Sequence, residues 1–451
     1  MATKDHLAEG KEMRQTVPRE EHAGWRAPKD RPDPVHVLEE QDATREPELV
    51  PIRHGRMLVS AFTFFRGTAA IMAWDLAHTP TTSLTVQACG DAHLSNFGVF
   101  AAPDRRLVFD LNDFDETLPA PFEWDLKRLA ASFVVAARDS EFADRDQRAA
   151  ARAAVSEYQH MMAEFVKMPF LDVWYTRIDV DRLLELLAPT TRKKGLSRVR
   201  KGIAKAQSKT SLGALARFAE KVDGAFRIKP DPPVVVPITP DQLAASEALI
   251  RRAFADYGAT LSPERRIVLS RYHYADFARK VVGVGSVGTE AFMLLLMGER
   301  DDDPLFLQLK EAQESVLAPY AGASEYDQHG ERVVQGQRIM QAASDSFLGW
   351  LAASGKDYYV RQLRDMKGSV DVATLDPKGL RTYARVCGAT LARAHARSGQ
   401  VGQLSGYVGK GAPFARAIEE FAVAYADQNE HDYQALLDAE RDGRIAVERG
   451  V

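Results

Sequence analysis

Residues 89–116 read CGDAHLSNFGVFAAPDRRLVFDLNDFDE, and the rest of the chain is organised around this stretch. Two short apolar runs, at residues 99–100 and 107–109, flank residues 102–106, which contain Pro and Asp. Apolar, partly β-branched runs on either side of turn-forming residues are typical of a β-hairpin. The stretch is therefore predicted to be a hairpin with polar residues at both of its ends.

The polar residues of this stretch form two groups, one before the hairpin and one after it: Asp91, His93 and Asn96, then Asp110, Asp113 and Asp115. Carboxylate and amide oxygens bind hard cations, and a carboxylate can also serve as a base. The alternative is a polar, capped surface hairpin. We favour a cation site, because so many acids side by side would repel one another without one.

Composition sets the broad class of the protein. The chain has 451 residues, of which 45% are hydrophobic and 27% charged, with a formal net charge of -4. These values are typical of a soluble protein of two or three domains, and they do not predict nucleic-acid binding. No segment approaches the roughly 18 apolar residues of a membrane span, and the N-terminus has no apolar core typical of a secretory signal. With only two cysteines, Cys89 and Cys387, we predict a cytoplasmic protein in which Cys89 is a small buried residue.

Apolar periodicity predicts a mainly helical first half. Residues 1–50 are charged and contain five prolines, which predicts an irregular tail that lies over the body or is disordered. A strand is expected at 84–88 and a loop at 118–122. The basic residues between 192 and 209 are interpreted as a solvated helix face, with phosphate or an acidic partner as the alternative. Helices are expected at 57–78, 124–137, 144–166, 179–187 and 241–260, with an extended segment at 227–240.

A different pattern follows residue 260. Strands are predicted at 279–282, 291–297 and 305–310, joined by polar or glycine-rich turns. A helix is expected at about 330–348, a strand-like segment at 356–367, and further helices at 378–397 and 414–448. We therefore predict an α+β protein with four parts: the tail (1–50), a mainly helical lobe with the hairpin (51–260), a small antiparallel-sheet lobe (261–375), and C-terminal helices that pack on the large lobe (376–451).

Residues 283–289, GVGSVGT, match G-x-G-x-x-G, which alone is a weak signal. Here the glycines lie between two predicted strands, whereas in a dinucleotide-binding fold they would open a helix. A glycine-rich hairpin lets backbone N–H groups approach phosphate oxygens closely, and Lys310 on the next strand would add a compact positive charge. The alternative is a tight hairpin and a lysine at a strand end. We predict phosphate binding by Lys310 and by the turn residues Gly283, Gly285, Ser286 and Gly288.

A base, two kinds of metal ligand and a phosphate-binding turn are the parts of a kinase-type phosphoryl-transfer site. The sequence Gly90-Asp91-x-His93-x-x-Asn96 resembles the catalytic loop of the aminoglycoside and choline phosphotransferase branch of the protein-kinase-like superfamily. The resemblance implies that Asp91 is the catalytic base and Asn96 a magnesium ligand. It also implies that Asp110 is the main metal-binding aspartate, with Asp113 as the alternative. His93 is grouped with the catalytic residues, and we expect it to brace the loop by hydrogen bonds.

Over nearly its whole length the chain also resembles a bacterial family named domain of unknown function 2252 (DUF2252). The stretches that carry this resemblance are CGDAHLSNFGVF, FDLNDFDET, WDLKRLAAS, VVGVGSVGT and FLQLKEA.

The chain order departs from that of ordinary kinases, in which the glycine loop precedes the catalytic loop. Here Lys310 follows Asp91 by about two hundred residues. We therefore expect a circularly permuted, two-lobed kinase-like fold, which is possible where chain ends lie close together at the surface. Residues 383–397 resemble the helix that precedes the catalytic loop in the phosphotransferases. Kinases also pair this lysine with a helix glutamate, for which we favour Glu331 over Glu314 and Glu325.

These inferences lead to one expected function and several alternatives. The expectation is an ATP- and Mg2+-dependent phosphotransferase acting on a hydroxyl of an unidentified small-molecule or protein acceptor, away from membranes. The alternatives are an adenylyl-transferring or protein-modifying enzyme on the same scaffold, a non-catalytic nucleotide-binding pseudokinase, and a metal-dependent hydrolase.

Overall fold

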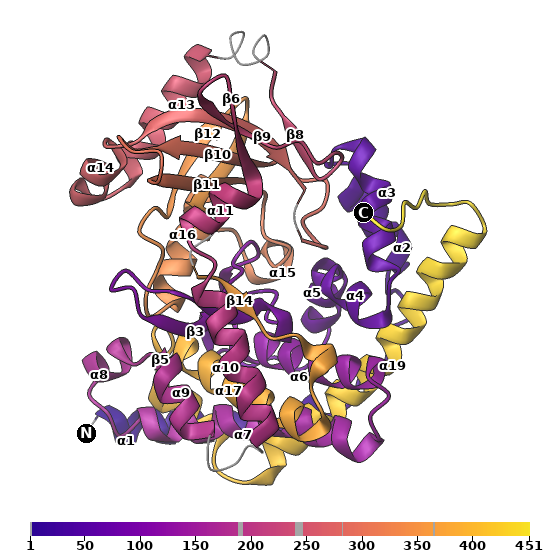
Figure 1. Ribbon diagram of the computed structural model, residues 1–451. Helices are drawn as coiled ribbons and strands as arrows, with labels where there is room; N and C mark the ends of the chain where they lie inside the picture. Colours follow the sequence, from indigo (N-terminus) through magenta and orange to yellow (C-terminus); the bar gives the residue numbers. More distant parts are fainter. Residues whose placement is uncertain (1, 188–192, 240–246, 282, 364–365) are drawn as a thin grey trace.

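The computed structural model describes residues 2–187, 193–239, 247–281, 283–363 and 366–451 (Figure 1). Parts of the predicted basic run, of the helix at 241–260 and of the strand at 279–282 therefore lie outside the described residues. The protein is a mixture of helices and antiparallel sheets, which confirms the α+β class.

The strands form four antiparallel groups. A six-stranded sheet has the order β12-β13-β11-β10-β9-β8, a four-stranded sheet the order β14-β2-β3-β5, and β1-β4 and β6-β7 form two-stranded pairs. The bounds are β1 (Thr85–Ala88), β2 (Phe97–Ala101), β3 (Leu107–Leu111), β4 (Leu118–Pro121), β5 (Ile178–Asp179), β6 (Ala219–Val222), β7 (Ala225–Ile228), β8 (Val235–Pro237), β9 (His273–Lys280), β10 (Ala291–Met297), β11 (Pro304–Ala312), β12 (Gly349–Ala353), β13 (Lys356–Gln362) and β14 (Gly368–Ser369).

The helices make up the larger part of the molecule, with the longest ones gathered in the lower half of Figure 1. Their bounds are α1 (Ala2–Thr16), α2 (Pro34–Asp42), α3 (Val50–Met57), α4 (Ala61–Arg66), α5 (Ala69–Ala77), α6 (Phe122–Asp139), α7 (Asp144–Phe165), α8 (Phe170–Tyr175), α9 (Val180–Leu187), α10 (Lys193–Gln207), α11 (Ser211–Phe218), α13 (Glu247–Thr260), α14 (Pro263–Leu269), α15 (Ala318–Ala321), α16 (His329–Met340), α17 (Pro377–Ala396), α18 (Val401–Val408) and α19 (Ala412–Arg441).

The six-stranded sheet has a hydrophobic layer on each face, because side chains alternate along a strand. On one face Leu294 and Leu307 pack with Tyr257 of α13. On the other face Met293 and Phe306 pack with residues of α11 and of the β6-β7 pair. The hairpin predicted at residues 291–310 is confirmed, with Ala291 of β10 opposite Lys310 of β11.

The largest core lies in the helical body. Helix α6 is buried along almost its full length, and it packs between α7, α17 and α19. Phe414 and Phe421 of α19 join the same cluster as Phe122 and Phe133 of α6. The C-terminal helices therefore complete the lobe that carries the hairpin β2-β3, and they bring residues from both ends of the chain into one core.

The prediction of an irregular tail at residues 1–50 was wrong. This segment forms α1 and α2, because Pro34 occupies the first turn of α2, where a missing N–H costs nothing, and Asp33 caps that helix. Arg31 ties the segment to the body through ion pairs to Asp75 at 2.7 Å and Asp432 at 2.6 Å.

Three other local predictions needed correction. The helix predicted at 57–78 is two helices, α4 and α5, which follow the end of α3 at Met57, because Ser60 caps α4 and Gly67 ends it. Residues 118–121 are strand β4, paired with β1, and not a loop. Strand β8 (Val235–Pro237) extends the six-stranded sheet and α13 (Glu247–Thr260) packs on it, so the predicted lobe boundary at residue 260 lies too late in the chain.

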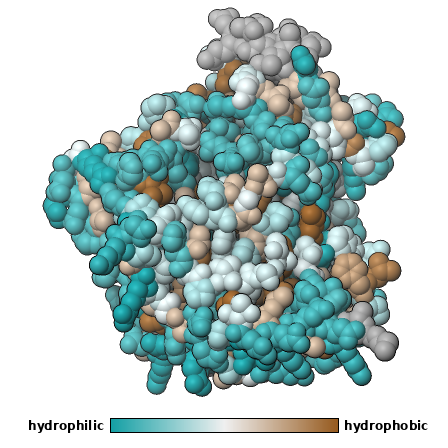
Figure 2. Space-filling model, turned by 180° about the vertical axis from the view of Figure 1, so that it is seen from behind, coloured by the Kyte–Doolittle hydropathy of each residue, from teal (hydrophilic) through white to brown (hydrophobic). Residues whose placement is uncertain are grey.

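The surface is mostly polar. Figure 2 shows that the face opposite to Figure 1 is covered mainly by hydrophilic side chains, with hydrophobic residues in small separate groups. In the basic run, Arg200, Lys201 and Lys205 are exposed, as predicted for a solvated helix face. Within the described ranges, no helix is both long enough and apolar enough to cross a membrane.

Candidate active site

The loop that follows β1 is held against the helical body by backbone hydrogen bonds. The N–H groups of Cys89 and Gly90 donate to the carboxylate of Asp125, at 2.6 and 2.9 Å, in the first turn of α6. His395 of α17 lies 3.1 Å from the same carboxylate. Gly90 has a φ of +80°, and a Cβ there would lie 2.4 Å from the carbonyl oxygen of Glu116, so only glycine fits. Cys89 is buried, as predicted.

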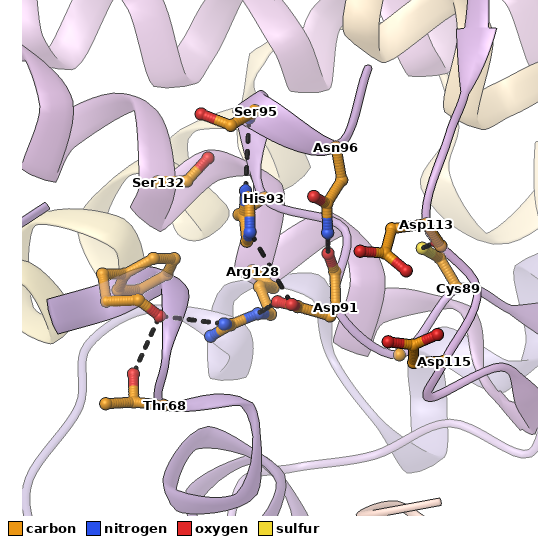
Figure 3. Close-up of polar contacts among 12 residues, drawn as sticks. Thr68, Cys89, Asp91, His93, Ser95, Asn96, Asp113, Asp115, Arg128 and Ser132 are labelled. Carbon is orange, nitrogen blue, oxygen red and sulfur yellow. Dashed lines mark hydrogen bonds and ion pairs between the residues drawn. The ribbon is translucent and has the colours of Figure 1, made fainter. Parts of the chain in front are cut away.

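Asp91 is the first polar residue of this loop, and a single arginine orients it. Arg128 of α6 donates from Nε to Asp91 Oδ1 at 2.5 Å and from Nη2 to the carbonyl oxygen of Phe65 at 3.0 Å (Figure 3). Burial raises the pKa of Asp91 to about 7, although Arg128 acts in the opposite direction. Asp91 is therefore poised to gain or lose a proton near neutral pH.

His93 and Asn96 shape the loop around Asp91. The His93 ring accepts the N–H of Ser95 at 3.2 Å, and its Nε2 lies 3.6 Å from Asp91 Oδ2. Burial, and then the charge of Arg128, keeps the pKa of His93 well below its ordinary value. His93 is thus a neutral side chain with the bracing contacts expected of it. Asn96 donates its side-chain N–H to the carbonyl oxygen of Asp91 at 2.7 Å, so its amide oxygen is the end that could hold a cation.

Asp115 joins the two parts of the chain that were predicted to meet. Its carboxylate forms a short ion pair with Lys310 of β11, accepts the hydroxyl of Tyr359 at 2.8 Å and lies 3.4 Å from Ser286 Oγ. Burial acts against the charged form of Asp115, but Lys310 outweighs it and keeps the pKa of that carboxyl below its ordinary value. The lysine and the glycine turn therefore do reach the acidic segment.

Asp113 is the acidic residue with unused binding capacity. Its Oδ1 is buried and has no hydrogen-bond partner. Burial, and then the neighbouring charge of Asp115, raises the pKa of Asp113 above its ordinary value. In Figure 3 its carboxylate is turned toward Asn96. An unpartnered buried carboxylate oxygen is costly, so this position suits a cation.

Asp110 does not face this site, which corrects its prediction as the main metal ligand. It is 2% exposed, forms a short ion pair with Arg393 of α17 and accepts the backbone N–H of Ala342 at 3.1 Å. Because side chains alternate along β3, Asp110 points toward α17 and away from the loop of Asp91. Asp113, the alternative that the sequence left open, does line the cavity with Asp91.

Only some of the residues predicted to bind phosphate in the glycine turn line the candidate site. Gly283, Gly285 and Ser286 line the same cavity as Asp91 and Asp113. Gly288 does not: its φ is +92°, its carbonyl oxygen accepts the N–H of Glu46 at 2.8 Å, and a Cβ there would lie 2.9 Å from the side chain of Arg45. Gly288 therefore packs the turn against the N-terminal segment, and its assignment to phosphate binding is corrected.

Glu331 is not the partner of Lys310. Its backbone N–H is capped by Gln328 and its carboxylate accepts from Gln335, both on or next to α16. Lys310 instead pairs with Asp115. Arg332, which directly follows Glu331 in α16, does reach the acidic segment. Its side chain donates hydrogen bonds to the carbonyl oxygens of Asp115 and Thr117, at 2.8 and 2.7 Å.

One cavity of about 1050 Å³ is lined by Asp91, His93, Asn96, Asp113 and Asp115. Its walls come from the loop of Asp91, from residues 113–116, from the glycine turn, from residues 311–316 and from the N-terminal helices α2, α4 and α5. Lys310 lies behind the wall, buried between Asp115 and the ring of Tyr359.

Several residues of the site were not predicted: Asp115 as the partner of Lys310, Arg128, Arg66, Arg332 and Tyr359. Arg128 lies in the WDLKRLA stretch, three residues after Asp125, so its helical spacing offered a signal. Arg66 and Tyr359 come from segments whose only connection to the site is tertiary packing.

Comparison with known proteins gives one match. Residues 45–439 match the sequence profile of a family described as "Uncharacterized protein conserved in bacteria (DUF2252)". The chain belongs to the DUF2252 family. No curated protein and no solved structure matches the chain. For this DUF2252 protein, membership defines the family and carries no activity with it, so the function is argued from the geometry of the cavity.

Proposed function

We propose that this protein is an ATP- and Mg2+-dependent phosphotransferase that acts on a hydroxyl group. The observation that carries the proposal is the meeting of two distant segments at one cavity. The glycine turn between β9 and β10 faces Asp91 and Asp113, and Asp115 contacts both Ser286 and Lys310. A phosphate-approaching turn, a candidate base and a carboxylate with a free oxygen are parts that phosphoryl transfer requires, and Lys310 holds the acidic segment in place through Asp115.

The arrangement of the small sheet supports a kinase-like assignment. The glycine turn joins two antiparallel strands, the lysine lies on the next strand, β11, and helix α16 follows before β12. Protein kinases have a lysine on their third strand and a helix after it. The two units would correspond to the small and large lobes of a kinase.

Circular permutation is part of the proposal. The C-terminal end of α17 lies beside β1, since Ser398 Oγ accepts the N–H of Gln87 at 2.8 Å. In an unpermuted chain the helix corresponding to α17 would lead directly into the strand before the catalytic loop. This contact supports the idea that the same spatial order is reached here by a different chain order.

Asp113 and Asn96 would hold the metal ion. Among the residues that the structure describes, no three His, Cys, Asp or Glu side chains converge on a metal position. This fits Mg2+, which is usually bound through one or two carboxylates and otherwise by substrate phosphates and water. When bound, Mg2+ would neutralise charge on the phosphate oxygens.

Asp91 would accept the proton of the acceptor hydroxyl. A bond forms between the acceptor oxygen and the terminal phosphorus of ATP, and the bond from that phosphorus to the bridging oxygen breaks, which releases ADP. The proton moves from the hydroxyl to Asp91, which Arg128 holds in place. Lys310 and Asp115 position the strand and the acidic segment relative to each other.

The Asp91→Asn variant tests the proposal. We expect ADP release from ATP to fall by about a hundredfold or more, the upper part of the range for general-base catalysis, because the base is lost. Binding of Mg-ATP should remain, seen as thermal stabilisation, since saturating ligand contributes roughly 2.7 kcal/mol at 100 times its Kd. ADP formation by Asp91→Asn at the wild-type rate would contradict the assignment, and release of pyrophosphate in place of ADP would favour adenylyl transfer.

A further inference from the structure

Arg66 is a cation on the cavity wall to which the proposed function has not yet given a role. It is the last residue of α4 and lines the cavity with Asp91 and Asp113. Its Nε is buried without a hydrogen-bond partner. Among the described residues, no group forms an ion pair or hydrogen bond with its side chain.

Other arginines near the cavity are already occupied. Arg45 donates to the carbonyl oxygen of Val287 at 2.5 Å, and Arg128 pairs with Asp91. Arg53 pairs with Asp42. A guanidinium has five donors that match phosphate oxygens in pairs, so a partly buried one without a partner is suited to an anion.

The backbone fixes Arg66 between the two halves of the site. Arg128, which holds Asp91, also bonds the carbonyl oxygen of Phe65, the residue before Arg66. On the other side, a Cβ at Gly285 would lie 3.3 Å from the carbonyl oxygen of Arg66, so the glycine turn packs directly on the end of α4. Arg66 therefore keeps its position relative to both the proposed base and the phosphate-binding turn.

Asp91 and Asp113 line the same cavity as Arg66 but form no ion pair or hydrogen bond with its side chain. Burial lowers the pKa of Arg66 below its ordinary value, although the charges of Asp91 and Asp113 act in the opposite direction. Arg66 and these two acids line one cavity without direct contact, which leaves room for a group among them. A phosphoryl group transferred from the glycine turn toward Asp91 would occupy such a position.

We propose that Arg66 binds the terminal phosphoryl group of the nucleotide and stabilises its charge during transfer. This inference rests on the proposed function and adds to it a residue from the N-terminal part of the chain. In this arrangement α4 supplies the cavity with a cation. Lys310 does not supply one, because Asp115 neutralises its charge.

The test compares the affinity of the full-length protein for two ligands, a non-hydrolysable ATP analogue and ADP, each with Mg2+, by calorimetry. Because Arg66 would contact only the terminal phosphoryl group, Arg66→Gln should weaken binding of the ATP analogue by about 10-fold or more. Its affinity for ADP should be nearly unchanged. Arg66→Lys should recover part of the loss. Arg145→Gln is the matched control, because Arg145 is 87% exposed on α7 and far from the cavity lining.

The outcomes separate this inference from the proposed function. If Arg66→Gln weakened the binding of both nucleotides equally, or of neither, the role of Arg66 would be overturned. The proposed phosphotransferase function would still stand. A wild-type protein that binds neither nucleotide would contradict the proposed function. In that case the protein is titrated with inorganic phosphate. Phosphate binding that is abolished by Arg66→Gln would support a phosphoryl site that takes its phosphate from a source other than ATP. No phosphate binding would overturn the role of Arg66.

Discussion

Asp91 owes its proposed role as a base to two opposing effects. Burial raises its pKa to about 7, and the Arg128 guanidinium limits that rise. A base must be ionised to accept a proton, so activity should be present above this pKa and lost below it. His93 stays neutral through this range, because its pKa lies well below its ordinary value.

We therefore predict that kcat/KM for ATP turnover falls as pH decreases, with half of its plateau value near pH 7. In Arg128→Lys the weaker, single-point contact should lower the pKa of Asp91 less than arginine does, which moves the midpoint to higher pH. The measurement is the pH profile of both proteins. A midpoint near pH 4 in the wild-type protein, or a shift to lower pH in Arg128→Lys, would contradict this account of Asp91.

At the scale of elements, the two acids Asp110 and Asp113 at the end of β3 have different surroundings. Asp113 leaves an unpartnered oxygen at the cavity, whereas Asp110 is paired with Arg393 and fastens β3 to α17. Both residues are acids in the same short segment, but only one of them has an open side. Their variants should differ accordingly.

Asp110→Ala should lower the free energy of unfolding by about 3–5 kcal/mol, because it leaves Arg393 charged and buried without its counter-charge. The double variant Asp110→Leu/Arg393→Met should recover much of that loss, since apolar residues can replace a buried ion pair. Urea denaturation measures both effects. If Asp110→Ala kept full stability but lost Mg2+-dependent nucleotide binding, Asp110 would be a metal ligand after all.

Strands β10, β11 and β13 could be predicted from the sequence, because alternation, glycine turns and apolar runs act over a few residues, whereas β12 and most of β9 were missed. The hairpin 291–310 and the helix 378–397 follow from such local patterns. The direction of Asp110 could not be predicted, since it depends on where α17 lies in space. The break of the helix at 57–78 was missed because its causes, the Ser60 cap and Gly67, are single residues within an apolar repeat.

At the scale of the whole molecule, the site is assembled from three distant parts of the chain: the N-terminal helices, the hairpin segment and the small sheet. Sequence motifs located the second and third of these. The first had no motif, because the segment that carries Arg45 is held on α5 and α19 by the ion pairs of Arg31, and Arg66 stands at the end of the separate helix α4. Apolar and charged contacts made at long range leave no periodic signal in the sequence.

The most direct test of the central claim is a crystal structure of the protein with Mg2+ and a non-hydrolysable ATP analogue. The account predicts a triphosphate between the glycine turn and Asp113, with Mg2+ bound by Asp113 and Asn96, and with the terminal phosphoryl group between Arg66 and Asp91. A nucleotide bound outside this cavity, or a cavity that holds no nucleotide at a saturating concentration, would contradict it.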